Sequence, residues 1–299
     1  MITVREIARL RAQLAPERVA GRSIGLVPTM GSLHEGHLSL IRRARADNDV
    51  VVMSLFVNPA QFDDPDDLRS YPRDERRDAE LAAAAGVDYV FAPSVDEIYP
   101  SGFSTTVHVA GLSQGLEGAN RGAGHFNGVA TVVTKLLNIV APDRAYFGRK
   151  DAQQAAVIAR LVRDLDLEVE VRVGPTVRDV DGLALSSRNQ LLTPTDRARA
   201  TALHRALRCV ARAAAAQPDR PSALQAGRAE LERAGLQPEY LEIVDASTMA
   251  PAEIDGGERL AVVAARIGPV RLIDNLPLQE GGMDSPNEVA TPVGAPTNR

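Results

Sequence analysis

The sequence predicts an α/β protein with a mostly parallel sheet, followed by a smaller α+β domain. In the first half of the chain, apolar strand-like runs alternate with helix-periodic runs, which is typical of βαβ units. After about residue 175 two helical runs precede three β-rich segments. We therefore expect a first domain over 1–175 and a smaller, lid-like domain over 176–280. The Gly-, Pro-, Asn- and Thr-rich tail, 281–299, is expected to be disordered.

The elements of the first domain follow from the position of the apolar runs. Strands are expected over 24–28, 50–57, 87–92, 105–110 and 143–147. Helices are expected over 37–47, 73–85, 126–140 and 151–164. Because ligands of parallel sheets bind at the carboxyl ends of the strands, the loops after residues 28, 57 and 147 should share one rim.

In the second domain, Thr193 and Pro194 predict a helix start, with threonine as the N-cap and proline at the first helical position. This helix is expected to run to about Ala216. A second helix over 222–234 and strands over 239–245, 259–267 and 270–274 complete the predicted elements.

Composition excludes several classes of protein. The net charge is −5, and the arginine pairs are interleaved with acidic residues, which argues against a nucleic-acid partner. Cys209 is the only cysteine, so neither an internal disulfide nor a cysteine-based zinc site is possible. The longest apolar stretch, Val50 to Val57, is too short to span a membrane, and the N-terminus lacks the features of a signal peptide. We expect a cytoplasmic protein that binds no membrane.

The most informative stretch is 28–37, Pro-Thr-Met-Gly-Ser-Leu-His-Glu-Gly-His, which lies between a predicted strand and a predicted helix. Backbone N–H groups at a helix start favour an anion, and imidazoles add hydrogen bonds, and positive charge when protonated. His34 and His37 therefore predict a nucleotide-phosphate site, and Gly36 would let the backbone approach a ligand closely. Metal ligation and a purely structural pair remain as alternatives, but the spacing is not that of a metalloprotease helix.

Three further segments follow strands or lie in a connection. Asn58 and Gln61 are amides suited to a substrate with hydroxyls and a carboxylate, although Asn58 is equally suited to a turn. Lys150 could neutralise phosphate, while Asp151 could cap the next helix or bind a ribose hydroxyl. Ser186, Ser187 and Arg188 are suited to a mobile phosphate clamp.

Taken in order, these segments resemble the pantoate–β-alanine ligase family. The matching pieces cover most of residues 20–275 and are PTMGSLHEGH, SLFVNPAQF, YPR, LEG, HFNGVATVVTKLLNIVAPDRAYFG, KDAQQ, PTVRDVDGLALSSRN and YLEIVD. The family is similar to H-x-G-H nucleotidylyltransferases and class I aminoacyl-tRNA synthetases in its Rossmann-like first domain, and its members are cytoplasmic homodimers. The resemblance implies that pantoate attacks the α-phosphorus of Mg-ATP to give pantoyl adenylate and pyrophosphate. β-Alanine then attacks the acyl carbon, giving pantothenate and AMP.

The resemblance also implies roles for individual residues. His34, His37 and Lys150 would be catalytic and stabilise the phosphates, with His37 as the proton donor. Gln61 and Gln154 would bind pantoate, with Gln61 also near β-alanine; Asn58 is added to this substrate-binding set. Mg²⁺ would enter with the ATP phosphates rather than at a protein metal site. The implied ATP-binding positions are Met30, Gly31, Ser32, Leu33, His34, Glu35, Gly36, His37, Gly148, Arg149, Lys150, Asp151, Val177, Leu185, Ser186, Ser187 and Arg188.

The sequence departs from the family pattern in three places. Arg149 stands where the family usually has Glu, and should add charge near the phosphates. Ala152 replaces a common tyrosine, and the glycine-rich segment 120–125 is one residue longer than usual. Two other functions stay open from the motifs alone: a nucleotidylyltransferase that leaves AMP on its product, and a nucleotide-binding regulatory module. The amides Gln61 and Gln154 favour a small hydroxy acid over a phosphorylated acceptor.

Overall fold

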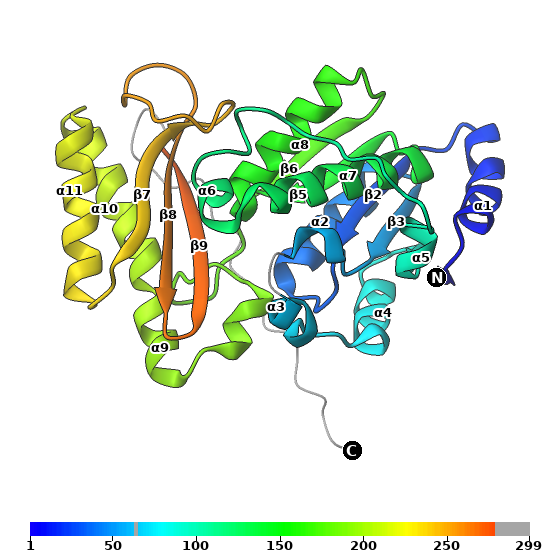
Figure 1. Cartoon of the computed structure of the whole chain (residues 1–299), viewed down its shortest axis with the longest axis horizontal. Helices are drawn as coiled ribbons and strands as arrows, with labels where there is room; N and C mark the ends of the chain where they lie inside the picture. Colours follow the sequence, from blue (N-terminus) through cyan, green and yellow to red (C-terminus); the bar gives the residue numbers. More distant parts are fainter. Residues whose placement is uncertain (63–64, 279–299) are drawn as a thin grey trace.

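A sheet of six parallel strands forms the first part of the molecule in the computed structural model, which describes residues 1–62 and 65–278 (Figure 1). The strand order is β1-β4-β3-β2-β5-β6, and every neighbouring pair is parallel. The strands are β1 (Ile2–Val4), β2 (Ile24–Thr29), β3 (Val50–Leu55), β4 (Tyr89–Phe91), β5 (Arg144–Gly148) and β6 (Glu170–Gly174).

The strand order reverses direction at β2. From β2 the chain proceeds to β3 and β4 on one side, then crosses to β5 and β6 on the other. At such a switch point the loops after the two central strands diverge and leave a crevice at the carboxyl edge. The loops after β2 and β5, which carry the two histidines and Lys150, flank this crevice.

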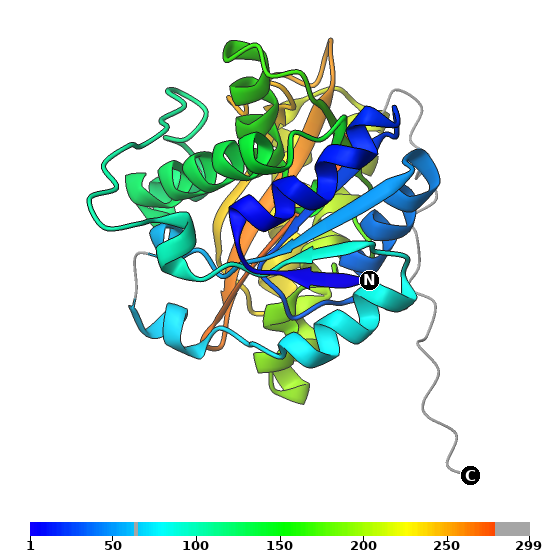
Figure 2. The same cartoon turned by 90° about the vertical axis from the view of Figure 1, so that its right-hand side faces the viewer.

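Helices cover both faces of this sheet because alternate strand residues point to opposite faces. Leu26 and Val52 pack with α1 (Ile7–Val19), α7 (Ala123–Val140) and α8 (Ala152–Asp164). Val27 and Met53 pack with α2 (Glu35–Asp47) and α4 (Glu75–Ala84) on the other face. Figure 2 shows α1 and α7 on one side of the strands and α4 on the other. Short helices α3 (Pro65–Ser70), α5 (Val95–Ile98) and α6 (Glu117–Arg121) lie in the connections.

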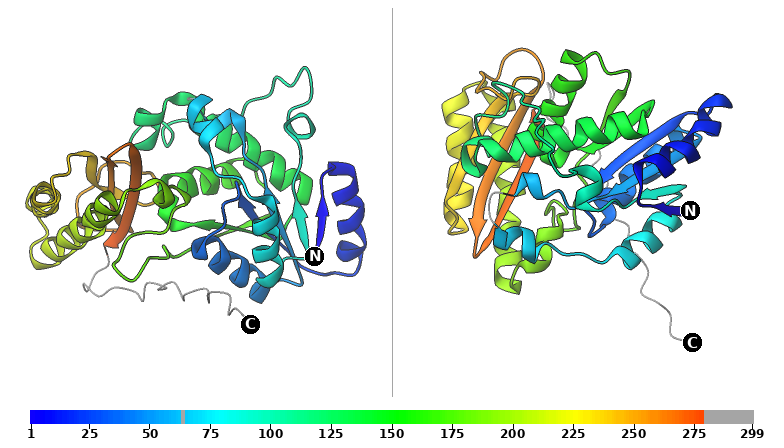
Figure 3. Two further views of the ribbon diagram at one scale, coloured as in Figure 1. Left: turned by 90° about the horizontal axis from the view of Figure 1, so that it is seen from below. Right: turned by 45° about the vertical axis from the view of Figure 1, so that its right-hand side comes forward.

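A second, antiparallel sheet separates the remaining helices from the first part. Its strands are β7 (Pro238–Asp245), β8 (Arg259–Ile267) and β9 (Val270–Leu278). Ala261 and Val263 of β8 pack with α10 (Ala202–Ala216) and α11 (Arg220–Arg233). Leu260 and Val262 instead join the core of the first part. Figure 3 shows α10 and α11 at the far end of the molecule from α1.

The fold class predicted from the sequence is confirmed, with an α/β first part and a smaller antiparallel sheet with helices. The strand expected over 105–110 is wrong, because this extended segment pairs with no strand among the described residues. The helix expected from 194 to 216 is two helices, α9 (Pro194–Ala200) and α10, which meet at Thr201. β1, β6 and α1 were not anticipated.

Two expectations about the ends of the domains are not decided. The tail over 281–299 lies outside the described residues, and the boundary at 175 stays a prediction. Within residues 1–62 and 65–278, no helix has both the length and the hydropathy needed to cross a bilayer.

Candidate active site

A cavity of about 260 Å³ opens at the carboxyl ends of β2, β3 and β5, and the second sheet contributes part of its wall. The loops after residues 28, 57 and 147 all line it, so the predicted common rim is confirmed. The predicted site residues that line it are Met30, His34, Gly36, His37, Asn58, Gln61, Gly148, Lys150, Asp151, Gln154, Val177, Leu185, Ser186, Ser187 and Arg188.

Five predicted ATP-binding positions are not among the described residues that line the cavity: Gly31, Ser32, Leu33, Glu35 and Arg149. The first three form the turn behind the histidines, and Glu35 pairs with Arg42 on the surface of α2. Arg149 shares a short 3₁₀ turn, η2 (Arg149–Asp151), with Lys150 but does not line the cavity. The expected added charge beside the phosphates is therefore not seen at the cavity wall.

The two histidines cap the start of α2 with their own rings. His34 is the N-cap residue, and its Nδ1 accepts from the backbone N–H of Gly36 at 3.2 Å. His37 Nδ1 accepts from the backbone N–H of His34 at 3.4 Å. Because each Nδ1 is an acceptor, each neutral ring carries its proton on Nε2. Both histidines also line the cavity, which leaves these Nε2–H groups as the donors suited to a phosphate.

Gly36 makes room for the capping ring of His34, and it also lines the cavity. A Cβ at this position would lie 2.9 Å from Cε1 and 3.0 Å from Nδ1 of His34. The sequence argument had assigned the missing side chain to close contact with a ligand. In the structure, the missing side chain makes room for the imidazole of His34.

Burial makes both histidines neutral at physiological pH. Desolvation, then the charges of His37 and Lys150, lowers the pKa of His34 to about 2. Desolvation is also the largest effect at His37 and lowers its pKa to about 4. The charge of Asp151 raises this pKa, and the charge of Lys150 lowers it. The positive charge anticipated from these rings is therefore absent from the unliganded protein near pH 7. Lys150 is a nearby cation whose charge lowers the pKa of both rings.

Lys150 and Asp151 face each other at the start of α8. Lys150 Nζ lies 3.6 Å from Asp151 Oδ1, and the lysine side chain is mostly buried. Asp151 occupies the N-cap position of α8, but its side chain makes no capping hydrogen bond. Of the two roles expected for Asp151, the helix cap is thus wrong, and the carboxylate is directed toward the lysine.

Gln61 is held in the cavity wall by Asn58. Asn58 is 1% exposed and donates to Gln61 Oε1 at 3.2 Å and to the carbonyl of Gly128 at 3.0 Å. Its Oδ1 accepts from Ala60 N–H and from the hydroxyl of Tyr99. These four bonds use the full capacity of an amide, so the turn interpretation fits Asn58, which supports Gln61. Direct contact of Asn58 with a substrate would require one of them to break.

The turn before the histidines is fixed by Asp78, a residue that sequence reasoning missed. Its carboxylate accepts from the backbone N–H of Ser32 at 2.8 Å and of Leu33 at 2.7 Å. Gly31 has a φ of +86°, and a Cβ there would lie 2.8 Å from Asp78 Oδ2. Asp78 stands in a run of charged residues on α4, and nothing in that run distinguishes it from a solvated side chain.

The predicted clamp segment is hydrogen-bonded to the turn before the histidines. Ser186 accepts from the backbone N–H of Arg188 at 3.3 Å, and Ser187 Oγ donates to the carbonyl of Ser32 at 3.2 Å. The carbonyl of Val177 accepts from Leu185 N–H at 3.0 Å. The hydrogen bonds thus bring Val177, a predicted ATP-binding position, together with the clamp and the turn before the histidines at one side of the cavity.

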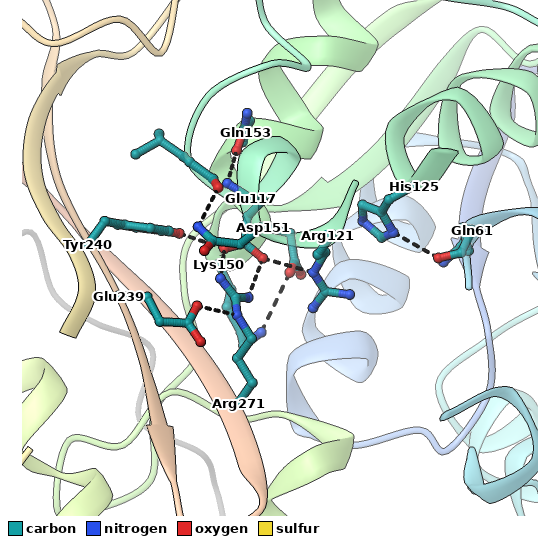
Figure 4. A network of polar contacts seen from close by, with 12 residues as sticks. Gln61, Glu117, Arg121, His125, Lys150, Asp151, Gln153, Glu239, Tyr240 and Arg271 are labelled. Carbon is teal, nitrogen blue, oxygen red and sulfur yellow. Dashed lines mark hydrogen bonds and ion pairs between the residues drawn. The ribbon is translucent and has the colours of Figure 1, made fainter. Parts of the chain in front are cut away.

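Glu117 joins α6 to the second sheet beside the cavity (Figure 4). Its carboxylate accepts from Arg271 at 2.6 and 2.7 Å, from the Tyr240 hydroxyl at 2.8 Å and from Arg121 Nε at 3.0 Å. Its backbone N–H donates to Gln153, a buried residue whose amide also donates to two carbonyls of the preceding loop. Sequence reasoning quoted Leu116-Glu117-Gly118 only as part of the resemblance and gave Glu117 no role.

Within the described part of the chain, no group of three or more His, Cys, Asp or Glu side chains is arranged to hold a metal ion. Among the residues that line the cavity, His34, His37 and Lys150 can donate hydrogen bonds to an anion, and Gln61 and Gln154 can bond a small polar substrate.

Comparison with known proteins agrees with this geometry. The family model for pantoate-beta-alanine ligase matches residues 2–277. The pantothenate synthetase of Moorella thermoacetica is 53% identical over 283 residues, covering 93% of this chain and 99% of that protein. The pantothenate synthetase of Corynebacterium efficiens is 51% identical over 287 residues, covering 93% and 99%.

Solved structures give the same result. The crystal structure of pantothenate synthetase from Thermus thermophilus matches with a TM-score of 0.88 and 49% identity, covering 92% of this chain and 99% of that one. The pantoate-beta-alanine ligase of Francisella tularensis, complexed with beta-gamma ATP and beta-alanine, matches with a TM-score of 0.78 and 36% identity, over 95% and 100%. Sequence and fold together show that the chain belongs to the pantoate–β-alanine ligase family of pantothenate-forming enzymes.

Proposed function

We propose that this enzyme joins (R)-pantoate to β-alanine in two steps that share the cavity. In the first step the pantoate carboxylate attacks the α-phosphorus of Mg-ATP, and pyrophosphate leaves with the electron pair of the α–β phosphoanhydride bond. In the second step the neutral amine of β-alanine attacks the acyl carbon of pantoyl adenylate. The carbon–oxygen bond to AMP then breaks, and the amine loses a proton to give the amide of pantothenate.

The observation that carries the proposal is the meeting of His34, His37 and Lys150 at one cavity, from the two sides of the switch point between β2 and β5. Negative charge gathers on the α-phosphate as the carboxylate attacks. Donors fixed in advance beside that charge stabilise the transition state more than the ground state. The ATP and β-alanine named for the Francisella tularensis relative support the same pair of substrates here.

Each polar group has a role that matches its position. The Nε2–H groups of His34 and His37 donate to phosphate oxygens, and Lys150 supplies the positive charge. Arg188 and the hydroxyls of Ser186 and Ser187 hold the triphosphate, whose Mg²⁺ arrives as part of the substrate. Gln61 and Gln154 are predicted to bind pantoate, and Val177 and Leu185 are predicted to bind ATP.

Phosphate binding also alters the histidines. A polyanion next to His37 and His34 favours the protonated form, so their pKa values rise when ATP binds. A ring that gains a proton in this way can return it to the departing pyrophosphate, which accounts for the predicted proton-donor role of His37. The cavity is lined by residues of both sheets, and under this proposal those walls shield the adenylate from water between the steps.

The direct test of the overall reaction is product analysis with ATP, Mg²⁺ and pantoate, with and without β-alanine. Sustained AMP formation is expected only when both pantoate and β-alanine are present. AMP formation that is independent of pantoate, or release of ADP in its place, contradicts the proposal. Lys150→Ala or His37→Ala should slow adenylation on the order of 10²–10³-fold, measured as pantoate-dependent pyrophosphate exchange.

The resemblance also supports a cytoplasmic homodimer. Sedimentation equilibrium of the purified chain is expected to give twice the monomer mass, and a single-chain mass contradicts the dimer.

A further inference from the structure

We propose that Asn275, on β9 of the second sheet, is a positioning residue for Lys150. Its side-chain amide donates to the backbone carbonyl of Arg149 at 2.8 Å and to that of Lys150 at 2.9 Å. Both hydrogens of the Asn275 amide are therefore bonded to backbone carbonyls of the turn that carries Lys150. Asn275 is 3% exposed, so water does not compete for these bonds.

Asn275 is itself held by a buried ion pair. Arg178 donates to both oxygens of Asp274, at 2.6 and 3.0 Å, and both side chains are almost fully buried. The same guanidinium donates to the carbonyl of Asn275 at 3.1 Å, and Asp274 accepts from the backbone N–H of Asn275 at 2.8 Å. Because its backbone is bonded on both sides, Asn275 presents its amide from a fixed position.

The turn that receives these bonds has no side-chain cap at its start or at the start of the helix that follows it. η2 is a single 3₁₀ turn, and its N-cap residue, Gly148, has no side chain with which to cap it. The side chain at the next N-cap position, Asp151, makes no capping hydrogen bond. An amide that bonds two successive carbonyls therefore sets the direction of the Lys150 side chain from outside the turn. Asparagine fits this position because its amide offers two hydrogens, while aspartate in its ionised form offers none.

The arrangement connects two parts of the molecule that the reaction needs together. Arg178 directly follows Val177, a predicted ATP-binding position, while Asn275 belongs to the second sheet and Lys150 to the loop after β5. Lys150 thus takes its phosphate-binding position only while β9 lies against η2. This inference rests on the proposed adenylation role of Lys150, whereas the contact between Asn275 and η2 can be tested apart from it.

The first test measures the turn itself. Asn275→Ala and Asn275→Asp are each expected to speed amide hydrogen exchange over residues 149–153 at least ten-fold relative to the wild type. Glu230→Ala is the control, because Glu230 is also buried but accepts from Arg205 and Arg233 on α10 and α11, and it is not among the described residues that line the cavity. The control should lose comparable stability and leave exchange over 149–153 unchanged. Wild-type exchange there in both Asn275 variants overturns the inference.

The second test asks whether Asn275 acts through Lys150. Asn275→Ala is expected to lower the rate of pantoate-dependent pyrophosphate exchange at saturating substrates about 10- to 100-fold, with little change in the KM for pantoate. Added to Lys150→Ala, it should cause almost no further loss, since its effect passes through the missing amine. Equal losses in both backgrounds overturn the positioning role. If Lys150→Ala alone exchanges at the wild-type rate, the proposed role of Lys150 fails, and hydrogen exchange still decides whether Asn275 holds the turn.

Discussion

At the scale of single residues, the two imidazoles that cap α2 are neutral donors before the substrate arrives. His34 and His37 satisfy backbone N–H groups through Nδ1 and leave Nε2 for the phosphates. Because burial lowers the pKa of His34 to about 2 and that of His37 to about 4, both rings are neutral near pH 7, and under the proposed mechanism ATP meets hydrogen-bond donors that become charged as it binds. The arrangement avoids burying two positive charges beside Lys150 in the empty site.

This protonation state can be measured directly. In ¹⁵N-histidine spectra of the unliganded enzyme, both rings should keep the neutral Nε2–H pattern down to pH 6, with assignments from His34→Gln and His37→Gln. Lower pH should protonate His37 first, near its pKa of about 4, and His34 only below that. Saturating ATP should raise at least one of these pKa values. Titration of either His34 or His37 above pH 6 without ATP contradicts the account.

At the scale of elements, the packing of α7 on a short turn positions Gln61, the predicted pantoate-binding residue. The turn η1 (Pro59–Gln61) follows β3 and ends in Gln61. A Cβ at Gly128 of α7 would lie 2.1 Å from the carbonyl oxygen of Ala60 and 2.7 Å from the backbone nitrogen of Gln61. Helix and turn are therefore in backbone contact, and His125 on the same helix bonds the carbonyl of Gln61 at 2.8 Å.

Gly128→Ala should push η1 away and misplace Gln61. The expected loss is on the order of 10- to 100-fold in kcat/KM for pantoate, with the KM for ATP little changed. Steady-state kinetics at varied pantoate and then at varied ATP separate the two effects. Asn138→Ala is the control on α7, because that side chain bonds only a carbonyl of its own helix. Unchanged pantoate kinetics in Gly128→Ala would show that Gln61 is not the pantoate contact.

Elements were predictable where local patterning and packing agree. Helices α2, α4, α7, α8 and α11 and the central strands β2, β3 and β5 were found to within three residues at their ends, whereas α1 was missed and the start of α10 was placed at 194 rather than 202. The segment 105–110 alternates like a strand, but its bonds go to a helix: Val107 N–H donates to Thr131 Oγ1 of α7 at 2.9 Å. The edge strand β1 is only three residues long, too short for a pattern to be recognised.

The site was predictable in its motifs but not in its supports. The histidine motif, Lys150 and Gln61 stand in strand-to-helix connections, where sequence order alone indicates a common rim. Asp78, Glu117 and Asn275 act through contacts between residues 36 or more positions apart in the chain. Such contacts depend on tertiary packing, which leaves no local pattern.

At the scale of the whole molecule, Glu117 connects α6 of the first part to the second sheet next to the cavity. Burial alone would raise the pKa of this carboxyl, but the hydrogen bonds and charge of Arg271, with the charge of Arg121, lower it to about 2. Arg271 also bonds Glu239 of the second sheet, as Figure 4 shows. The ion pair therefore favours the arrangement in which the second sheet lies against α6.

The stability of the enzyme should depend on pH through Glu117. A carboxyl whose pKa is lower when folded stabilises the fold fully above its ordinary value of 4.5, and loses this contribution as the pH falls toward 2. Glu117→Gln should lower the free energy of unfolding at pH 7 by on the order of 3 kcal/mol. The difference from the wild type should shrink below pH 4.5.

Urea unfolding at several pH values measures this dependence. Glu80→Gln, at an exposed ion pair on α4, is the control and should change stability by less than about 1 kcal/mol at every pH. A difference between the wild type and Glu117→Gln that stays constant from pH 7 to pH 3 would show that the ionised carboxylate is not what holds the sheets together.

The account as a whole depends on a pantoyl adenylate formed in this cavity, and oxygen transfer tests that most directly. Pantoate labelled with ¹⁸O in its carboxylate is converted in the presence of ATP, Mg²⁺ and β-alanine, and the products are examined by mass spectrometry. If the carboxylate attacks the α-phosphorus, AMP gains one ¹⁸O atom from each pantoate consumed, and the new amide keeps the other. Unlabelled AMP, or ¹⁸O recovered in inorganic phosphate together with ADP, contradicts the adenylate and the roles assigned to His34, His37 and Lys150.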